Sequence, residues 1–239
     1  MKKPIIAVVL TVEMLAIVAL ARASDTTTKI GPEEAIQRLT DGNARYVQGA
    51  SIHPDGSSAR RMETAANGQH PYVTILSCSD SRVPLEVLFD QGIGDIFVVR
   101  VAGNVCGQSE MGSIEYGVDH VGTPLLVILG HTGCGAVKAA TAHAEVHGNV
   151  KALVARIAPA LAEAQTAHPD LHDMDLVPAV TEANVWHSVE DLFTNSPITR
   201  DCAQSGKVKV VGAIYDIKTG QVKWLGEHPR QKALLTETK

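Results

Sequence analysis

Short runs of consecutive apolar residues alternate along the chain with longer stretches in which apolar residues recur every three or four positions. Runs of the first kind predict buried strands, and stretches of the second kind predict amphipathic helices. The expected strands cover residues 72–76, 95–101, 124–129 and 207–215, with a shorter edge strand at residues 221–225. Strands that alternate with helices are typical of an α/β domain with a mainly parallel sheet.

The helical stretches fill the intervals between these strands and are expected to flank the sheet. They cover residues 32–47, 59–66, 84–89, 109–120, 135–145, 150–167, 178–194 and 198–204. Pro32 starts the first of them, because proline is favoured in the first turn of a helix, and Glu33 and Glu34 suit the positive end of the helix dipole. We expect the first two helices to form an N-terminal arm that packs on the domain or on a partner subunit.

The start of the chain differs in composition from the rest. Two lysines precede a long apolar run, and Ala21-Arg22-Ala23 has the small-residue pattern of a signal-peptide cleavage site. An uncleaved membrane anchor is the alternative, but Glu13 within the run and the cleavage pattern favour removal. The sequence therefore predicts a cleaved signal peptide over residues 1–23, a single domain over residues 24–239, and a periplasmic or secreted location.

The net charge of the chain indicates which kinds of partner it can bind. The chain has a formal net charge of −5, and residues 1–23 carry three basic side chains and one acidic side chain, so their removal leaves −5 − 2 = −7. An acidic chain without a basic cluster argues against nucleic acid as a partner. We also expect no membrane association after cleavage, because no second apolar run of comparable length follows.

Potential metal ligands come directly after two of the predicted strands. Cys78 follows strand 72–76, and His131 and Cys134 follow strand 124–129. In an open α/β sheet, ligands bind beyond the carboxyl ends of the strands, where the strand order reverses. The three side chains can meet only if these two strands are neighbours, which predicts the strand order 2-1-3-4.

The combination of two thiols and one imidazole is typical of zinc. Structural zinc sites normally have four protein ligands, whereas three ligands leave one position free for catalysis. We interpret Cys78, His131 and Cys134 as an open site for one Zn2+ per subunit that generates hydroxide. The alternatives are buried core thiols beside a helix-capping histidine, and a non-catalytic structural-zinc module.

Asp80 and Arg82 follow Cys78 at intervals of two residues, so in an extended segment the three side chains lie on one side. The carboxylate of Asp80 can fill the fourth position on the metal, or it can pair with the guanidinium and leave that position open. In the paired state it accepts a hydrogen bond from the nucleophile and orients it. We therefore predict Asp80 and Arg82 as the catalytic pair, and the sequence is compatible with both states.

Several motifs together resemble the β-class carbonic anhydrases. They are Cys78-Ser-Asp80-Ser-Arg82-Val-Pro, Phe97-Val-Val-Arg100-Val-Ala-Gly103-Asn104, Glu115-Tyr116 and Gly130-His131-Thr-Gly-Cys134-Gly135. The resemblance covers residues 32–225 and implies reversible hydration of CO2 to bicarbonate by a zinc-dependent lyase. It also implies a homodimer or homotetramer with pockets near the subunit interface.

The resemblance further implies a substrate pocket. Its residues are Gln69, Phe97, Tyr116 and Gly135, and we add Ala102 and Gly103, which follow the second strand. Core packing or an exposed loop would equally explain such residue types. Some family members carry a second bicarbonate site built from a tryptophan, an arginine and a tyrosine. Arg100 and Tyr215 match that site, but Ile75 stands where the tryptophan would be, so we expect the plant-like subtype. Hydrolysis of a CO2 analogue, CS2 or COS, on the same fold is the alternative reaction.

Two questions stay open at the level of the sequence. The proton shuttle is not identified, and His70, His120 and Tyr116 are only candidates. Cys106 and Cys202 are either buried thiols or a disulfide pair, since paired cysteines are common in exported proteins.

Overall fold

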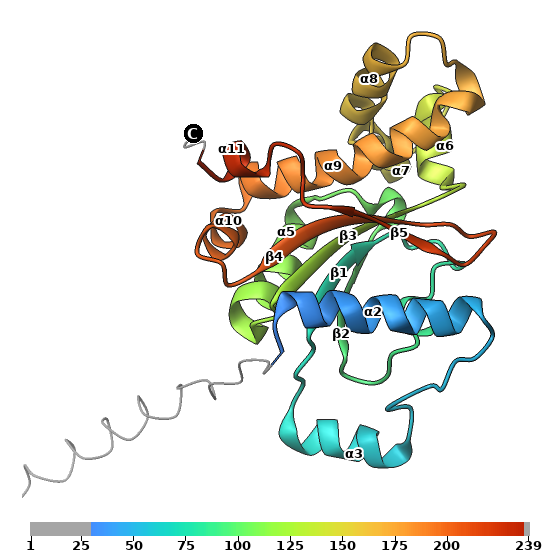
Figure 1. Cartoon of the computed structure of the whole chain (residues 1–239). Helices are drawn as coiled ribbons and strands as arrows, with labels where there is room; N and C mark the ends of the chain where they lie inside the picture. The colour runs from blue at the N-terminus through green and yellow to red at the C-terminus, as the bar shows by residue number, and fades with distance from the viewer. Residues whose placement is uncertain (1–29, 237–239) are drawn as a thin grey trace, which may run out of the picture.

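The computed structural model describes residues 30–236, and within this range five strands form one sheet in the order β2-β1-β3-β4-β5 (Figure 1). These strands are β1 (Val73–Ser77), β2 (Ile96–Arg100), β3 (Leu125–His131), β4 (Lys209–Tyr215) and β5 (Val222–Gly226). The first four are parallel, and β5 pairs with β4 in the antiparallel direction. The predicted fold class is confirmed, including the strand order 2-1-3-4 and the edge strand.

Helices cover both faces of this sheet (Figure 1). One face is covered by α2 (Pro32–Val47) and α4 (Leu85–Leu88). The opposite face is covered by α5 (Gln108–Glu115), the π-helical η3 (Tyr116–Val121), α9 (Val177–Asn195), α10 (Pro197–Gln204) and α11 (Gln231–Thr236). The connections contain α3 (Ser58–Asn67), η2 (Ala102–Asn104), α6 (Gly135–Thr141), α7 (Asn149–Ala155), α8 (Ala158–Ala167) and η4 (Asp173–Leu176).

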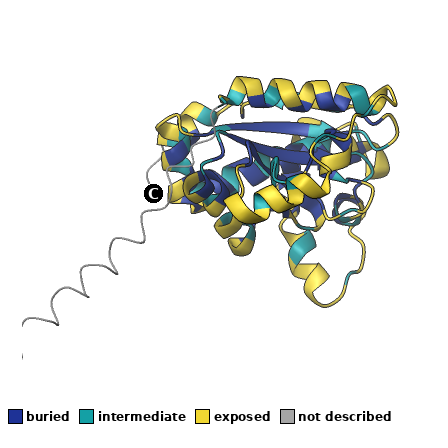
Figure 2. Ribbon diagram, turned by 90° about the horizontal axis from the view of Figure 1, so that it is seen from below, coloured by how far each residue is buried: buried dark blue, intermediate teal, exposed yellow. Residues whose placement is uncertain are grey.

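The central strands are buried on both faces, and Figure 2 shows strands in dark blue between the helices. In β1, Val73 and Ile75 pack in the layer under α2, whereas Leu76 packs in the layer under α9. Successive side chains of a strand point to opposite faces, so a strand covered on both sides is apolar at consecutive positions. This is why uninterrupted apolar runs identified the strands.

A buried amide fastens α2 to the domain. Asn43 Nδ2 donates to the carbonyl oxygens of Leu88 at 3.0 Å and Gly220 at 2.8 Å, and Asn43 Oδ1 accepts from the Val222 N–H at 2.9 Å. The first helix of the predicted arm is therefore packed on its own chain. Helix α3 contributes no buried residue, so it lies on the surface of the subunit.

One helix that was predicted as continuous is interrupted in the structure. The stretch 150–167 forms two helices, α7 and α8, with Arg156 and Ile157 between them. Pro159 lies in the first turn of α8. Proline lacks the N–H that a continuing helix would use and clashes with the turn before it, so it starts a new helix.

Other helix boundaries also differ from the prediction. The helix predicted over residues 135–145 corresponds to α6, which ends at Thr141. His143, just beyond this end, has a left-handed φ of 46°. The stretch 109–120 is α-helical only to Glu115 and continues as the π-helical η3. Helix α11 was not predicted, because a segment of six residues is too short to show clear periodicity.

Both cysteines whose state the sequence left open are buried. All four cysteines are free thiols, so Cys106 and Cys202 form no disulfide. Both pack in the apolar layer that contains α9. Burial raises the pKa of Cys106 to about 12, which makes it a poor nucleophile at neutral pH.

The predicted signal peptide, residues 1–23, lies outside the described residues. Within residues 30–236, no helix is both long and apolar enough to cross a bilayer. Signal cleavage and an extracytoplasmic location remain predictions.

Candidate metal centre

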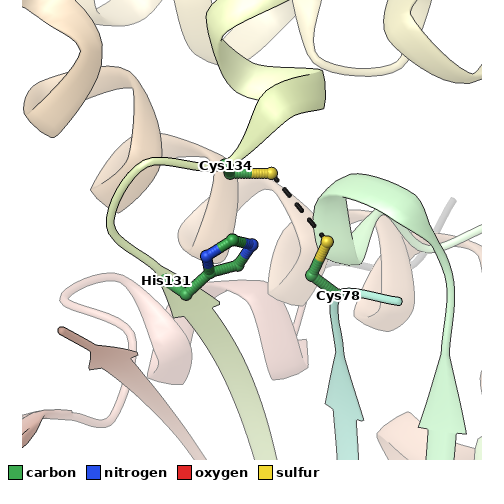
Figure 3. Close-up of side chains that lie close together, drawn as sticks. All are labelled: Cys78, His131 and Cys134. Atoms are coloured by element: carbon green, nitrogen blue, oxygen red, sulfur yellow. Dashed lines mark hydrogen bonds between the residues drawn. The ribbon is translucent and has the colours of Figure 1, made fainter. Parts of the chain in front are cut away.

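Three potential metal ligands meet at the carboxyl ends of β1 and β3. Cys78 directly follows β1, His131 is the last residue of β3, and Cys134 caps the N-terminus of α6. Their ligand atoms all lie within 4.8 Å of one another, and the three side chains face one another in Figure 3. At most 4% of each residue is exposed, so the cluster is shielded from solvent.

The geometry of this cluster fits a zinc ion. The two sulfurs are 3.9 Å apart, and tetrahedral zinc with bonds of about 2.3 Å places two thiolates about 3.8 Å apart. His131 Nδ1 lies 3.0 Å from the Thr132 carbonyl oxygen, to which it donates, so Nε2 keeps its lone pair. Nε2 is buried without a hydrogen-bond partner, as expected for an atom that binds a metal.

Hydrogen bonds favour a thiolate at Cys78. Its pKa is lowered chiefly by the hydrogen bond with Cys134, and then by His131 and the backbone N–H groups of Gly103 and Asp80. These N–H groups lie 3.2 Å and 3.4 Å from the sulfur. The pKa of Cys134 is raised, because its thiol is hydrogen-bonded to Cys78 and is buried. The thiolate is therefore favoured at Cys78 over Cys134, and binding of a cation releases thiol protons.

Asp80 is in the paired state. Its Oδ1 accepts from Arg82 Nε at 2.9 Å, and its Oδ2 accepts from Arg82 Nη2 at 2.7 Å. The Arg82 backbone N–H donates to the same carboxylate at 2.9 Å. The hydrogen bond from the Arg82 side chain is the main reason why the pKa of Asp80 lies well below its usual value. Oδ2 is 4.0 Å from His131 Nε2, so the ionised carboxylate borders the cluster.

Arg100 holds the segment that carries these residues. Its Nε donates to the Cys78 carbonyl oxygen at 3.0 Å, and its Nη2 donates to the Asp80 carbonyl oxygen at 2.7 Å. Residue spacing alone predicts no role for this arginine, although it lies in one of the motifs that resemble the family. Its position at the end of β2 is a further signal, because parallel strands that are neighbours end at the same edge of the sheet.

Part of the predicted substrate pocket borders the cluster. Gly103 donates its N–H to Cys78, Ala102 precedes it in η2, and Gly135 follows Cys134 at the start of α6. Ala102 and Gly135 are exposed, so these two residues lie at the surface beside the buried cluster.

The other pocket residues lie elsewhere in the same subunit. Phe97 is in register with Thr74, four residues before Cys78, which corresponds to about 13 Å along a strand. Tyr116 packs on Phe97 with ring centroids 5.9 Å apart and is 47% exposed. Gln69 is exposed before β1 begins. Within one subunit, these three side chains do not reach the three metal ligands.

Comparison with known proteins identifies the family. A family described as carbonic anhydrase matches residues 73–222. The chain is 38% identical to the carbonic anhydrase of Mycolicibacterium smegmatis over 195 residues, which are 80% of this chain and 92% of that protein. The chain belongs to the β-carbonic anhydrase family. It is therefore a zinc-dependent lyase, and its cysteine and histidine cluster fits the single zinc of these enzymes.

Other β-carbonic anhydrases agree with this assignment. Carbonic anhydrase 2 of Mycobacterium tuberculosis is 37% identical over 194 residues, which are 80% of this chain and 91% of that protein. The solved enzyme of Aspergillus fumigatus superposes with a TM-score of 0.65 at 27% identity and covers 85% of this chain and 96% of its own. The Coccomyxa enzyme, solved with acetazolamide, has a TM-score of 0.65 at 25% identity. The match covers 83% of this chain and 90% of the Coccomyxa chain.

Proposed function

We propose that this carbonic anhydrase hydrates CO2 reversibly at a centre formed by Cys78, His131 and Cys134. One observation carries the proposal. Three buried ligand atoms lie within 4.8 Å of one another, and His131 Nε2 has no hydrogen-bond partner. When bound there, zinc supplies a Lewis acid that makes a water molecule nucleophilic near neutral pH. Three protein ligands leave the fourth position to the reaction.

The pairing of Asp80 with Arg82 determines what the carboxylate does. A carboxylate whose pKa is well below its usual value is a weak base and stays ionised at neutral pH. Asp80 therefore accepts a hydrogen bond from the attacking O–H group and orients it, without removing the proton itself. Arg82 Nη2 also lies 3.4 Å from the Gly133 carbonyl oxygen, which steadies the guanidinium between the two ligand-bearing segments.

A second subunit completes the pocket in this proposal. Phe97 lies about 13 Å along the sheet from its own Cys78, and Tyr116 packs on Phe97. Val98, on the edge strand β2, is 37% exposed. An edge strand and the exposed ring of Tyr116 suit a contact with another copy of the chain. The fold is similar to that of a β-carbonic anhydrase of Sordaria macrospora that is described as tetrameric, with a TM-score of 0.65.

We assign the enzyme to the plant-like subtype. Ile75 is fully buried in the apolar layer under α2 and offers no polar group to a second bicarbonate ion. Arg100, which would contribute to such a site, already donates to two backbone carbonyl groups. The Asp80–Arg82 pair supports the same assignment, because the carboxylate is already engaged by the guanidinium.

Stopped-flow CO2 hydration with parallel measurement of zinc content tests the proposal. We expect activity that is lost on chelation and returns with one zinc per chain. Cys134→Ser is expected to lose both zinc and activity. A fully zinc-loaded protein without CO2 hydration would refute the proposal, and hydrolysis of COS or CS2 by that protein would favour the alternative reaction.

A further inference from the structure

We propose that Asn184 and Ser188 on α9 are positioning residues that aim the Gly103 N–H at the Cys78 sulfur. This inference rests on the proposed role of Cys78 as a zinc ligand and adds two residues from a distant part of the chain to the centre. Asn184 Nδ2 donates to the Gly103 carbonyl oxygen at 2.7 Å. The Ser188 hydroxyl lies 2.9 Å from the Asn104 carbonyl oxygen.

Both side chains are buried and have few alternative partners. Asn184 is 1% exposed and Ser188 is 3% exposed. The Ser188 hydroxyl lies equally near the carbonyl oxygen of Asn184 in its own helix, so its single proton is divided between two acceptors. Asn184 therefore makes the stronger contact with the turn, and Ser188 supports it.

The turn that these residues hold has a conformation that needs support. Gly103 has φ of 78° and Asn104 has φ of 45°, so two successive residues are left-handed. A non-glycine residue in this region persists only when its surroundings fix it. On one side, a Cβ added to Gly103 would lie 3.1 Å from both Ala136 Cβ and Ile157 Cδ1, so the turn already lies against α6 and the start of α8.

Helix α9 supplies the restraint on the other side. Peptide units are planar, so holding the carbonyls of Gly103 and Asn104 fixes two successive peptide planes. The Gly103 N–H belongs to the preceding peptide unit, which joins the first of these planes at the Gly103 Cα, and it points toward Cys78 Sγ at 3.2 Å. Asn184 and Ser188 thus act on Cys78 through the backbone of η2, without touching the sulfur themselves.

The consequence concerns the metal that Cys78 binds. An N–H donor orients a thiolate and takes up part of its charge, and outer partners of this kind change metal affinity about 10- to 100-fold. Without the aligned N–H, the sulfur is less well ordered and donates more charge to the metal. We therefore expect faster metal release and a lower-energy charge-transfer transition from sulfur to metal.

The experiment uses the full chain loaded with zinc, and separately with Co2+ as the spectroscopic probe. Asn184→Leu removes the donor and keeps the branching of the side chain, and it is expected to release zinc to a chelator on the order of 10-fold faster. Its sulfur-to-cobalt absorption band is expected at longer wavelength than in the wild type. Thr181→Val is the matched control, since this buried hydroxyl of α9 donates only within the helix, to the Val177 carbonyl oxygen.

The control separates positioning from general stability. If Asn184→Leu and Thr181→Val lower the melting temperature equally and leave zinc release and the cobalt band unchanged, the inference is overturned. If Asn184→Leu does not fold, Ser188→Ala tests the inference by zinc release and by the position of the cobalt band. Ser188→Thr is then expected to restore the wild-type values of both. A wild type that holds no zinc would refute the proposed function itself, whereas unchanged variants of a zinc-holding wild type would refute only this inference.

Discussion

The side chains of Asp80 and Arg82 form two parallel hydrogen bonds of 2.9 Å and 2.7 Å beside the metal ligands. Only a planar guanidinium can make this paired contact with a carboxylate, because a lysine ammonium is a point donor. The geometry of this pair sets the direction in which the carboxylate accepts its next hydrogen bond.

We therefore predict that Arg82→Lys lowers kcat/KM for CO2 hydration about 10- to 100-fold at unchanged zinc content. Arg38→Lys is the control, since Arg38 Nε and Nη2 also donate to a carboxylate, through a single oxygen of Glu34 on the exposed surface of α2. Stopped-flow assays at saturating zinc measure both variants. A variant at position 82 that is as active as the control would contradict the role of the pair.

A second prediction concerns the buried amide of α2. Asn43→Ala leaves the carbonyl groups of Leu88 and Gly220 and the N–H of Val222 without their partner. Each buried group left unpaired costs about 1–3 kcal/mol, so we expect a loss of at least about 2 kcal/mol in the free energy of unfolding. Urea denaturation measures this loss. Gln37→Ala, on the exposed side of the same helix, is expected to change the free energy of unfolding by less than about 0.5 kcal/mol.

A third prediction concerns pH. His228 is buried, and burial lowers its pKa, although the nearby Glu190 partly opposes this effect. A histidine with a lowered pKa in the folded state stabilises the protein above its unfolded pKa, and that contribution is lost as pH falls. The other charged groups around it are Arg230, His187 and Glu163.

The free energy of unfolding is therefore expected to fall below about pH 6.5, and His228→Gln is expected to reduce this dependence. Urea denaturation at several pH values between 5.5 and 7.5 compares the two proteins. His53→Gln serves as the control, because His53 is largely exposed. Equal slopes for all three proteins would show that His228 does not contribute.

A fourth prediction follows from the separation of Tyr116 from its own metal ligands. Cys78→Ser destroys one subunit's metal centre, and Tyr116→Ala removes the aromatic side chain that we expect at the partner's pocket. Each variant alone is expected to have low activity. In an equal mixture after subunit exchange, about a quarter of the sites are complete, so activity is expected to recover to about a quarter of wild type. No recovery in exchanged oligomers would mean that Tyr116 acts within its own subunit.

A fifth prediction concerns the N-terminus. We propose that residues 1–23 direct export and are removed, so the mature chain starts at Ser24. Mass spectrometry of the protein from the periplasm or medium is expected to give the mass of residues 24–239. Ala23→Asp is expected to block cleavage and leave the longer chain. A full-length chain in the cytoplasm would contradict the proposed location.

The sequence by itself determined the order of the strands and the residues that meet at the zinc centre. Apolar runs located β1 and β3, and Cys78, His131 and Cys134 each lie at or just beyond a strand end. Because parallel neighbours end at one edge, the need to bring three ligands together was enough to place those strands side by side. These are features of residues close to one another in the chain.

The tertiary structure decided which distant groups support that centre. Asn184 reaches Gly103 across 81 residues, and Asn43 reaches Gly220 across 177 residues. It also decided that Asp80 pairs with Arg82 and that Phe97 and Tyr116 are remote from their own zinc ligands. Periodicity and spacing encode local conformation, whereas the partner of a buried polar group depends on how helices pack on the sheet, and packing brings together residues that no local pattern relates.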